Sequence, residues 1–342
     1  AMNDAIVPGP VTHVPLTHAN VWPVGDELVV TWRGGGDVTV FVSSDPDDAG
    51  VDARAPEAPG QAVVARGEER VYVHLFDPGR GFTVVAERRL DMDGPSNFRD
   101  LGGYPTVDGA TTRWGQVFRS DRLDGLTADD HRRFERLGVT AVFDLRSAHE
   151  VANAPDRVPP SIRHVHLPMS SDTNQQRTIF ERISVGELTK YDENDMADGY
   201  LRMLDAFGDH FAEVVEAVAS GEPVVFHCTA GKDRTGLAAM VLLGLAGVAD
   251  PHVLDDYELT NRYRPESHDG ATARGTPFES LLAERGLDPT DFETLWQAPR
   301  PVMRRVVDGV RERWGDPRGY VEAVGVDPSS AEAARRHLRA EG

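Results

Sequence analysis

The ten residues His227-Cys-Thr-Ala-Gly-Lys-Asp-Arg-Thr-Gly236 hold the only cysteine of the chain, with an arginine six residues after it. Residues 222–226 predict a short buried strand, and the apolar run 237–248 predicts a buried helix. Cys228 is therefore expected in a loop at a helix N-terminus, where unpaired N–H groups and the helix dipole favour an anion, including the nucleophilic thiolate. Arg234 offers a planar set of donors that matches two phosphate oxygens. The stretch predicts transfer of a phosphoryl group to sulfur.

The same ten residues resemble the signature loop of the protein tyrosine phosphatase superfamily, His-Cys-x5-Arg-Ser/Thr. They resemble most the version in atypical bacterial phosphatases similar to mycobacterial tyrosine phosphatase B. Four other segments resemble that branch: Asn97-Phe-Arg-Asp-Leu-Gly-Gly103, Phe118-Arg-Ser-Asp121, Asp144-Leu-Arg-Ser147 and Tyr257-Glu-Leu-Thr-Asn-Arg-Tyr263. The tail around residues 303–325 does so too, so the resemblance covers roughly residues 95–340. It implies a two-step phosphatase that uses neither a metal nor a cofactor.

The loop supplies candidate catalytic and binding residues. Cys228 is the candidate nucleophile, forming a phosphocysteine intermediate that water hydrolyses; the alternative is a lone cysteine acting as a small buried hydrophobic residue. Arg234 is expected to bind the phosphoryl oxygens, or else to pair with a carboxylate at the end of the sheet. Backbone N–H groups around Thr229, Ala230 and Gly231 are expected to cradle the remaining oxygens.

Asp233 is the candidate general acid. A carboxylate inside an anion-binding loop repels both thiolate and phosphate, and the helix dipole repays only about 0.3–1 kcal/mol of stability. In the branch that the loop resembles, this aspartate is taken as the acid that protonates the leaving oxygen. Asp144 and the acidic residues of segment 170–198 are the alternative acids.

Five further residues are candidate binding or supporting groups. Lys232 would hold a second substrate phosphate, as in phosphoinositide phosphatases, or else lie in solvent. His227 is expected to orient the loop, and Thr235 to stabilise the departing thiolate or to cap the helix. Asp144 and Arg146 follow a predicted strand and would brace the loop, touch substrate or form a structural ion pair. No spacing of histidines and carboxylates predicts a metal site.

Composition argues against several classes of protein and partner. The 342 residues carry a net charge of −20, which opposes binding to nucleic acid or to an anionic membrane. The longest apolar run, the twelve residues 237–248, is too short to cross a bilayer. No signal peptide is visible, and a single cysteine suits a reducing compartment. We expect a cytoplasmic protein, with secretion without a visible signal peptide left open.

Residues 1–93 predict a small antiparallel β-domain, sandwich-like in form and of unknown role. Four segments alternate as strands in two pairs, joined at residues 34–36 and 77–79: 27–32 with 37–43, and 71–76 with 81–86. A connector rich in Pro, Asp and Ala, residues 44–61, separates the pairs. Trp22-Pro23 is followed by Val24, so it is not expected to be the Trp-Pro-Asp acid loop of other tyrosine phosphatases.

Residues 94–342 predict an α/β layered catalytic domain with a largely parallel central sheet flanked by helices, because strands and helices alternate along it. The predicted elements are strands 116–120, 139–144, 162–167 and 222–226, and helices 127–137, 204–220 and 237–248. In such sheets ligands bind beyond the carboxyl ends of the strands, where residues 227–234 fall. The polar segment 170–198 is a candidate lid or a solvated insertion, and residues 266–342 form a helical C-terminal part.

These features predict a cysteine-dependent phosphatase whose partner is a phosphorylated protein, hydrolysed at phosphotyrosine and also at phosphoserine or phosphothreonine. A phosphoinositide or another small phosphate ester is the alternative substrate. Arsenate reduction also uses a Cys-x5-Arg loop, but it normally needs further cysteines. A non-catalytic module that binds phosphorylated ligands is the last alternative, and the combination of Cys, Asp and Arg argues against it.

Overall fold

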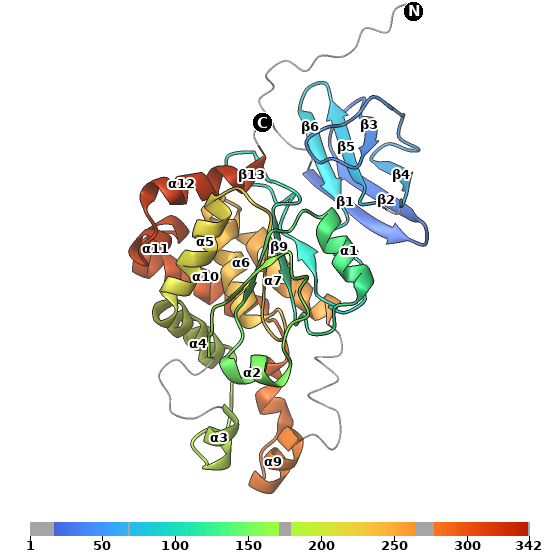
Figure 1. The fold of residues 1–342 in the computed structure, drawn as a ribbon. Helices are drawn as coiled ribbons and strands as arrows, with labels where there is room; N and C mark the ends of the chain where they lie inside the picture. Colours follow the sequence, from blue (N-terminus) through green and yellow to red (C-terminus); the bar gives the residue numbers. More distant parts are fainter. Residues whose placement is uncertain (1–16, 68, 171–178, 265–276, 341–342) are drawn as a thin grey trace, which may run out of the picture.

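The computed structural model describes residues 17–67, 69–170, 179–264 and 277–340. A small β-domain lies beside a larger α/β domain, and helices α3 and α9 project from the larger domain at the end away from the β-domain (Figure 1). The predicted fold class, an α/β layered domain with an N-terminal antiparallel β-domain, is confirmed. The boundary at residues 93/94 lies in the connection between the two parts and stays a prediction.

The β-domain consists of two three-stranded antiparallel sheets with the orders β1-β2-β4 and β3-β5-β6. Its strands are β1 Thr17–Val24, β2 Glu27–Arg33, β3 Thr39–Ser43, β4 Gln61–Ala65, β5 Tyr72–Asp77 and β6 Gly81–Ala86. Alternate residues of both sheets, among them Val30, Val40 and Leu75, are fully buried and form one core between the sheets.

The predicted second hairpin is present, since β5 pairs with β6, but the predicted first hairpin is wrong. β2 pairs with β1 and β4, and β3 lies in the other sheet. The glycine-rich residues 34–36 therefore carry the chain from one sheet to the other. Trp22 lies in β1 and its ring packs under the guanidinium of Arg262 at 5.0 Å, so it belongs to the contact between the domains.

The central sheet of the α/β domain has the order β11-β10-β12-β9-β7. Its strands are β7 Arg99–Asp100, β9 Val117–Ser120, β10 Ala141–Asp144, β11 Arg163–His166 and β12 Val224–His227. Four of them run parallel, as predicted, and the edge strand β7 is antiparallel to β9. A separate antiparallel pair is formed by β8 Thr111–Thr112 and β13 Arg339–Ala340.

Helices cover both faces of this sheet. They are α1 Ala128–Arg136, α2 Ala148–Asn153, α3 Ile179–Ser184, α4 Glu193–Ala206, α5 Gly208–Ala219, α6 Asp233–Leu245, α7 Asp250–Tyr263, α9 Pro277–Arg285, the 3-10 helix η1 Pro289–Leu295, α10 Arg300–Trp314, α11 Pro317–Ala323 and α12 Pro328–His337. Phe143 of β10 faces the core built with α4 to α7 and α10 to α12, whereas Val142 faces Phe134 of α1. The predicted helix 204–220 corresponds to α5. It begins only at Gly208, because the helix is interrupted at Phe207, which separates α4 from α5.

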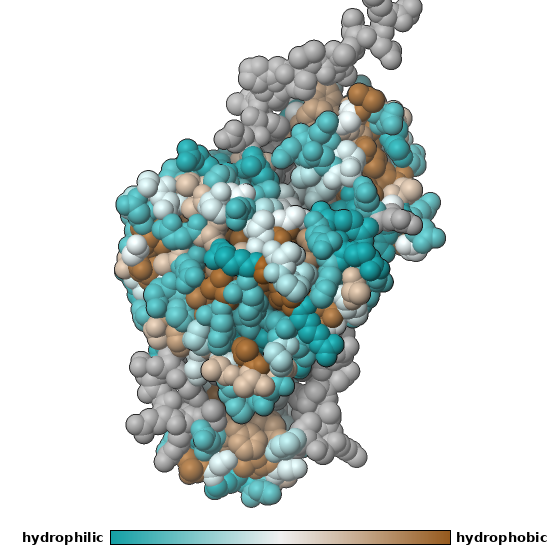
Figure 2. Space-filling view, in the orientation of Figure 1, coloured by the Kyte–Doolittle hydropathy of each residue, from teal (hydrophilic) through white to brown (hydrophobic). Residues whose placement is uncertain are grey.

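On the face shown in Figure 2 hydrophilic residues cover most of the surface, and apolar residues form small separate patches. Every helix in the described ranges is too short or too polar to span a bilayer.

Candidate active site

The predicted loop lies at the carboxyl edge of the central sheet. The strand register places Ser120 and Asp144 level with His227, so the segments that follow three neighbouring strands meet at this edge. Cys228 follows β12 with its side chain fully buried, and α6 begins at Asp233 with no side chain capping its N-terminus. The first N–H groups of α6 are therefore available to an anion.

Backbone carbonyls of residues 228–234, the signature loop, are bound from outside the loop. Asn97 Nδ2 donates to Ala230 O at 3.2 Å and to Gly231 O at 3.3 Å, and Arg119 Nη2 donates to Gly231 O at 2.6 Å. In a planar trans peptide the following N–H points away from the carbonyl. The N–H groups of residues 231 and 232 therefore point into the loop, and none of the described residues accepts them.

The carbonyl of Thr229 is bound in the same way, by Arg264 Nη1 at 3.2 Å. Gly231 adopts a φ of +63°, in the left-handed region. A Cβ added there would lie 2.6 Å from Ser120 O, so glycine is required by both conformation and space. The loop is held in one curved conformation with its donors inside.

Arg234 is held by Glu150, which the sequence analysis did not single out. Nη1 and Nη2 of Arg234 donate to the two Glu150 oxygens at 2.6 and 2.8 Å, and Nη1 also donates to Leu145 O and Met169 O. These bonds occupy both hydrogens of Nη1 and one of Nη2, out of five N–H donors. Within the described ranges Nε–H and one Nη2–H stay free, the pair that a phosphate group needs.

Glu150 owes its position to the start of α2. Ser147 caps this helix, and the Glu150 carboxylate accepts the Ser147 N–H at 2.8 Å while it also accepts the Thr229 hydroxyl at 2.5 Å. Burial opposes its charge, but the hydrogen bonds and charge of Arg234 outweigh burial and hold the pKa of Glu150 well below its usual range. Burial likewise opposes the charge of Arg234, and Glu150 outweighs it, so that the pKa of Arg234 is raised. The pair is ionised throughout the neutral pH range.

His227 lies in a buried ionic cluster behind the loop. Its Nε2 is 2.9 Å from Asp156 and 3.7 Å from Asp144, and Asp156 also lies 3.0 Å from His164. Arg146 contacts both Asp144 and Asp156 at 2.7 Å. The two aspartates and two histidines form a donor set of the kind that binds zinc, but the Arg146 guanidinium already balances both carboxylates. The structure places Asp144 and Arg146 here, supporting His227 from behind the loop.

Asp233, the candidate acid, is the first residue of α6, and its side chain is 32% exposed. Tyr200 of α4 donates a hydrogen bond to its carboxylate, and the Tyr200 hydroxyl lies 2.9 Å from that of Tyr257. Burial and the nearby Asp233 raise the pKa of Tyr200 well above its usual value, so Tyr200 remains a donor. The acid role of Asp233 stays a prediction. Of the alternative acids, Asp144 is buried in its ion pair, and part of segment 170–198 lies outside the described residues.

Lys232 and Thr235 take positions that the sequence left open. The Lys232 ammonium is nearly buried and donates to Leu295 O at 2.6 Å, in the last residue of η1, and to Gln297 O at 3.0 Å, just beyond it. It therefore ties the signature loop to η1. The Thr235 hydroxyl is buried and has no hydrogen-bond partner among the described residues, so it is free to serve a ligand in the loop.

Sequence analysis missed the residues that hold the loop from distant elements. They are Asn97, Arg119, Glu150, Tyr200 and Arg264. Asn97 and Arg119 stand in two of the segments quoted for the family resemblance, and Glu150 completes a Ser-x-x-Glu capping pattern. Tyr200 and Arg264 stand in no such pattern.

Comparison with known proteins shows the family of the chain. A family model described as "Tyrosine phosphatase family" matches residues 90–340. The chain is 35% identical to the triple specificity protein phosphatase PtpB of Mycobacterium tuberculosis, over 52% of this chain and 70% of that protein. It is 27% identical to a tyrosine-protein phosphatase of Nostoc commune, over 64% and 73% of the two chains. The solved Siw14 catalytic core of S. cerevisiae, in complex with citrate, aligns over 60% of this chain and 93% of that one at 16% identity, with a TM-score of only 0.28. The predicted family is thus confirmed, and this chain belongs to the tyrosine phosphatase family.

Proposed function

We propose that this protein hydrolyses phosphotyrosine in proteins through a phosphocysteine intermediate. The observation that carries this proposal is the orientation of the signature loop. Its carbonyls are bound outward by Asn97, Arg119 and Arg264, so its N–H groups face inward beside Cys228 and the two free donors of Arg234. Such a set matches the three equatorial oxygens of a transferring phosphoryl group.

In the first step Cys228 Sγ attacks phosphorus, and the bond from phosphorus to the ester oxygen breaks. Asp233 gives its proton to the departing oxygen, while Arg234 and the loop N–H groups hold the charge of the phosphoryl oxygens. In the second step a water molecule attacks phosphorus while Asp233 takes the proton of that water, and the bond from phosphorus to Cys228 Sγ breaks, so that inorganic phosphate and the Cys228 thiolate are released. We expect the Thr235 hydroxyl, which is buried and has no hydrogen-bond partner among the described residues, to donate to the departing thiolate.

The segment around α3 supports the proposal of a lid. Ile183 and Leu188 pack with Leu281, Leu282 and Phe292 in a small core of their own, and Tyr191 packs against both this core and that of the α/β domain. This core joins α3, α9 and η1 at the projecting end seen in Figure 1, and Lys232 connects η1 to the signature loop. A lid connected to the signature loop in this way would exclude water from the reaction.

A phosphorylated protein as substrate and the cytoplasm as compartment belong to the same proposal. The phosphoinositide alternative rested on Lys232, whose ammonium is engaged by two carbonyls and points to η1. Lys232 is the residue on which binding of a second phosphate depended, so we do not favour a phosphoinositide as substrate.

The test is phosphate release with EDTA present, from phosphotyrosyl and phosphoseryl peptides and from a phosphatidylinositol monophosphate. Faster release from the phosphotyrosyl peptide supports the proposal, and faster release from the lipid overturns its substrate. Cys228→Ser should abolish release from all three while binding of the phosphopeptide survives. Release by this variant at the wild-type rate would exclude the phosphocysteine intermediate.

A further inference from the structure

The chain that leaves the β-domain joins the edge of the central sheet. Residues 88–90 run antiparallel to β7, with two backbone hydrogen bonds of 3.0 Å: Asp100 N to Arg88 O and Leu90 N to Phe98 O. β7 is the edge strand on this side of the sheet. The connection between the domains is therefore hydrogen bonded to the sheet that carries the signature loop.

Asp100 faces the β-domain. Its Oδ2 accepts a hydrogen bond from Arg70 Nη1 at 2.5 Å and another from Gly115 N at 2.8 Å. The Asp100 side chain is fully buried and that of Arg70 is 11% exposed. Arg70 forms the ion pair with this carboxylate, and its removal would leave the buried charge with only the backbone N–H groups of Gly102 and Gly115 as partners.

Arg99, the neighbour of Asp100 in β7, faces the other way, as alternate residues of a strand do. Arg99 donates to the side-chain oxygen of Asn97 and, at 3.1 Å, to Asp256, which also binds Arg119. Asn97 and Arg119 are two of the residues that bind carbonyls of the signature loop, together with Arg264. Two adjacent residues of one strand thus connect the β-domain to the signature loop.

We infer that the β-domain is a working part of the catalytic unit, and that Arg70 is a positioning residue for the reaction. Arg70 fixes Asp100, which fixes β7, so that Arg99 and Asn97 hold the loop carbonyls outward and the N–H groups inward. The inference rests on the proposed function, because it assigns the β-domain to the site of that reaction.

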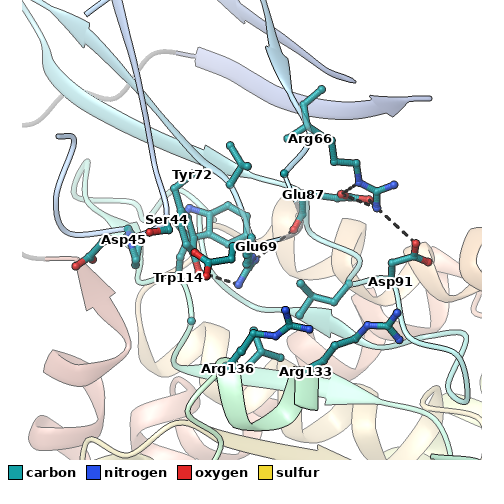
Figure 3. A pocket seen from close by; sticks show the side chains of 18 of the residues that line it. Ser44, Asp45, Arg66, Glu69, Tyr72, Glu87, Asp91, Trp114, Arg133 and Arg136 are labelled. Atoms are coloured by element: carbon teal, nitrogen blue, oxygen red, sulfur yellow. Dashed lines mark hydrogen bonds and ion pairs between the residues drawn. The ribbon is translucent and has the colours of Figure 1, made fainter. Parts of the chain in front are cut away.

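A matched control lies on the wall of the same cavity. Between the domains is a cavity of about 780 Å³, lined by Arg66 and Arg70 among others. Figure 3 shows Arg66 reaching toward Glu87 and Asp91, and Arg133 and Arg136 of α1 line the same cavity. Arg66 pairs with Glu87 and Asp91 at 3.1 and 3.7 Å, and among the described residues its side chain makes no hydrogen bond or ion pair with β7.

The experiment compares Arg70→Gln with Arg66→Gln in the full chain. The readouts are kcat and KM for p-nitrophenyl phosphate, the rate at which iodoacetamide alkylates Cys228, and the melting temperature. Arg70→Gln should lower kcat/KM by between about threefold and a hundredfold, since small displacements of a reacting group cost up to that factor. It should also slow alkylation, and Arg70→Lys, which keeps the charge beside Asp100, should restore part of both. Arg66→Gln should stay within about twofold of wild type.

If Arg70→Gln does not fold, Asp100→Asn takes its place in the experiment. Asp100→Asn removes the buried negative charge, and Arg70 in that variant can turn its own charge to solvent. Wild-type kinetics and alkylation in a folded Arg70→Gln or Asp100→Asn variant overturn the inference, and so does an equal loss in Arg66→Gln. Alkylation needs no substrate. A protein that released no phosphate would therefore refute the proposed function while alkylation still tested the role of Arg70.

Discussion

Replacement of Glu150 by glutamine is the sharpest test of how Arg234 is held. The carboxylate accepts hydrogen bonds from both Nη atoms of Arg234 and from the Thr229 hydroxyl. An amide has one acceptor oxygen, so its NH₂ group must face one of these donors and at least one bond is lost. A hydrogen bond to a charged group is worth about 1.5–3 kcal/mol, which corresponds to a roughly 10- to 150-fold change in rate.

We expect this loss in kcat, because Arg234 would be less well oriented towards the phosphoryl group. KM should not rise, because the substituted site also loses a negative charge that repels the substrate. The assay is steady-state hydrolysis of p-nitrophenyl phosphate with EDTA present. Glu222→Gln makes the same chemical change at an exposed residue that contacts Thr140 before β10, and it should leave both constants unchanged. An unchanged kcat in Glu150→Gln, or a loss confined to KM, would refute the positioning of Arg234 by Glu150.

Three further predictions concern the acid, the loop conformation and pH. Asp233→Asn should slow hydrolysis of alkyl phosphates far more than that of p-nitrophenyl phosphate, whose phenolate leaves unaided; equal losses would exclude Asp233 as the acid. Gly231→Ala should lower the free energy of unfolding by at least about 1–2 kcal/mol and abolish phosphate release, since the new Cβ would lie 2.6 Å from Ser120 O; thermal unfolding and activity at the wild-type level would contradict this. A hydrogen bond to Asp156 raises the pKa of His164, so their pair stabilises the fold below about pH 6.5 and loses its effect as pH rises through the raised value. His164→Gln should therefore lower the melting temperature near pH 6 but not near pH 9, and a difference that is constant with pH would count against the pair.

Much of the fold could be predicted because its strands are marked locally. Residues 139–144 and 222–226 are compact apolar runs, and both became buried strands of the central sheet. Strand β4 was missed because its five residues include two alanines and follow a proline-rich connector. The pairing of β2 with β3 was wrong because a glycine-rich turn permits either a hairpin or a passage between sheets, and the pairing of β2 with β1 and β4 decides between them.

The chemistry of the signature loop could be predicted from adjacent residues, but the means of holding it could not. The direction of a loop carbonyl depends on donors such as Asn97 and Arg264, which lie far away in the sequence. The position of Lys232 shows the same limit, since its carbonyl partner at Leu295 is 63 residues downstream. A lysine beside an anion-binding loop can bind either a substrate phosphate or the carbonyls of a neighbouring segment. The sequence does not decide between them, because it does not show where that segment lies.

The chain has only two lysines, and their surroundings differ sharply. Lys190 is exposed between α3 and α4, whereas the Lys232 ammonium is nearly buried under the carbonyls of Leu295 and Gln297. Amine-reactive reagents should therefore modify Lys190 at once and Lys232 only when the segment after η1 separates from the loop. The ratio of the two labelling rates would report the docking of this segment in the unmodified protein, without an introduced probe.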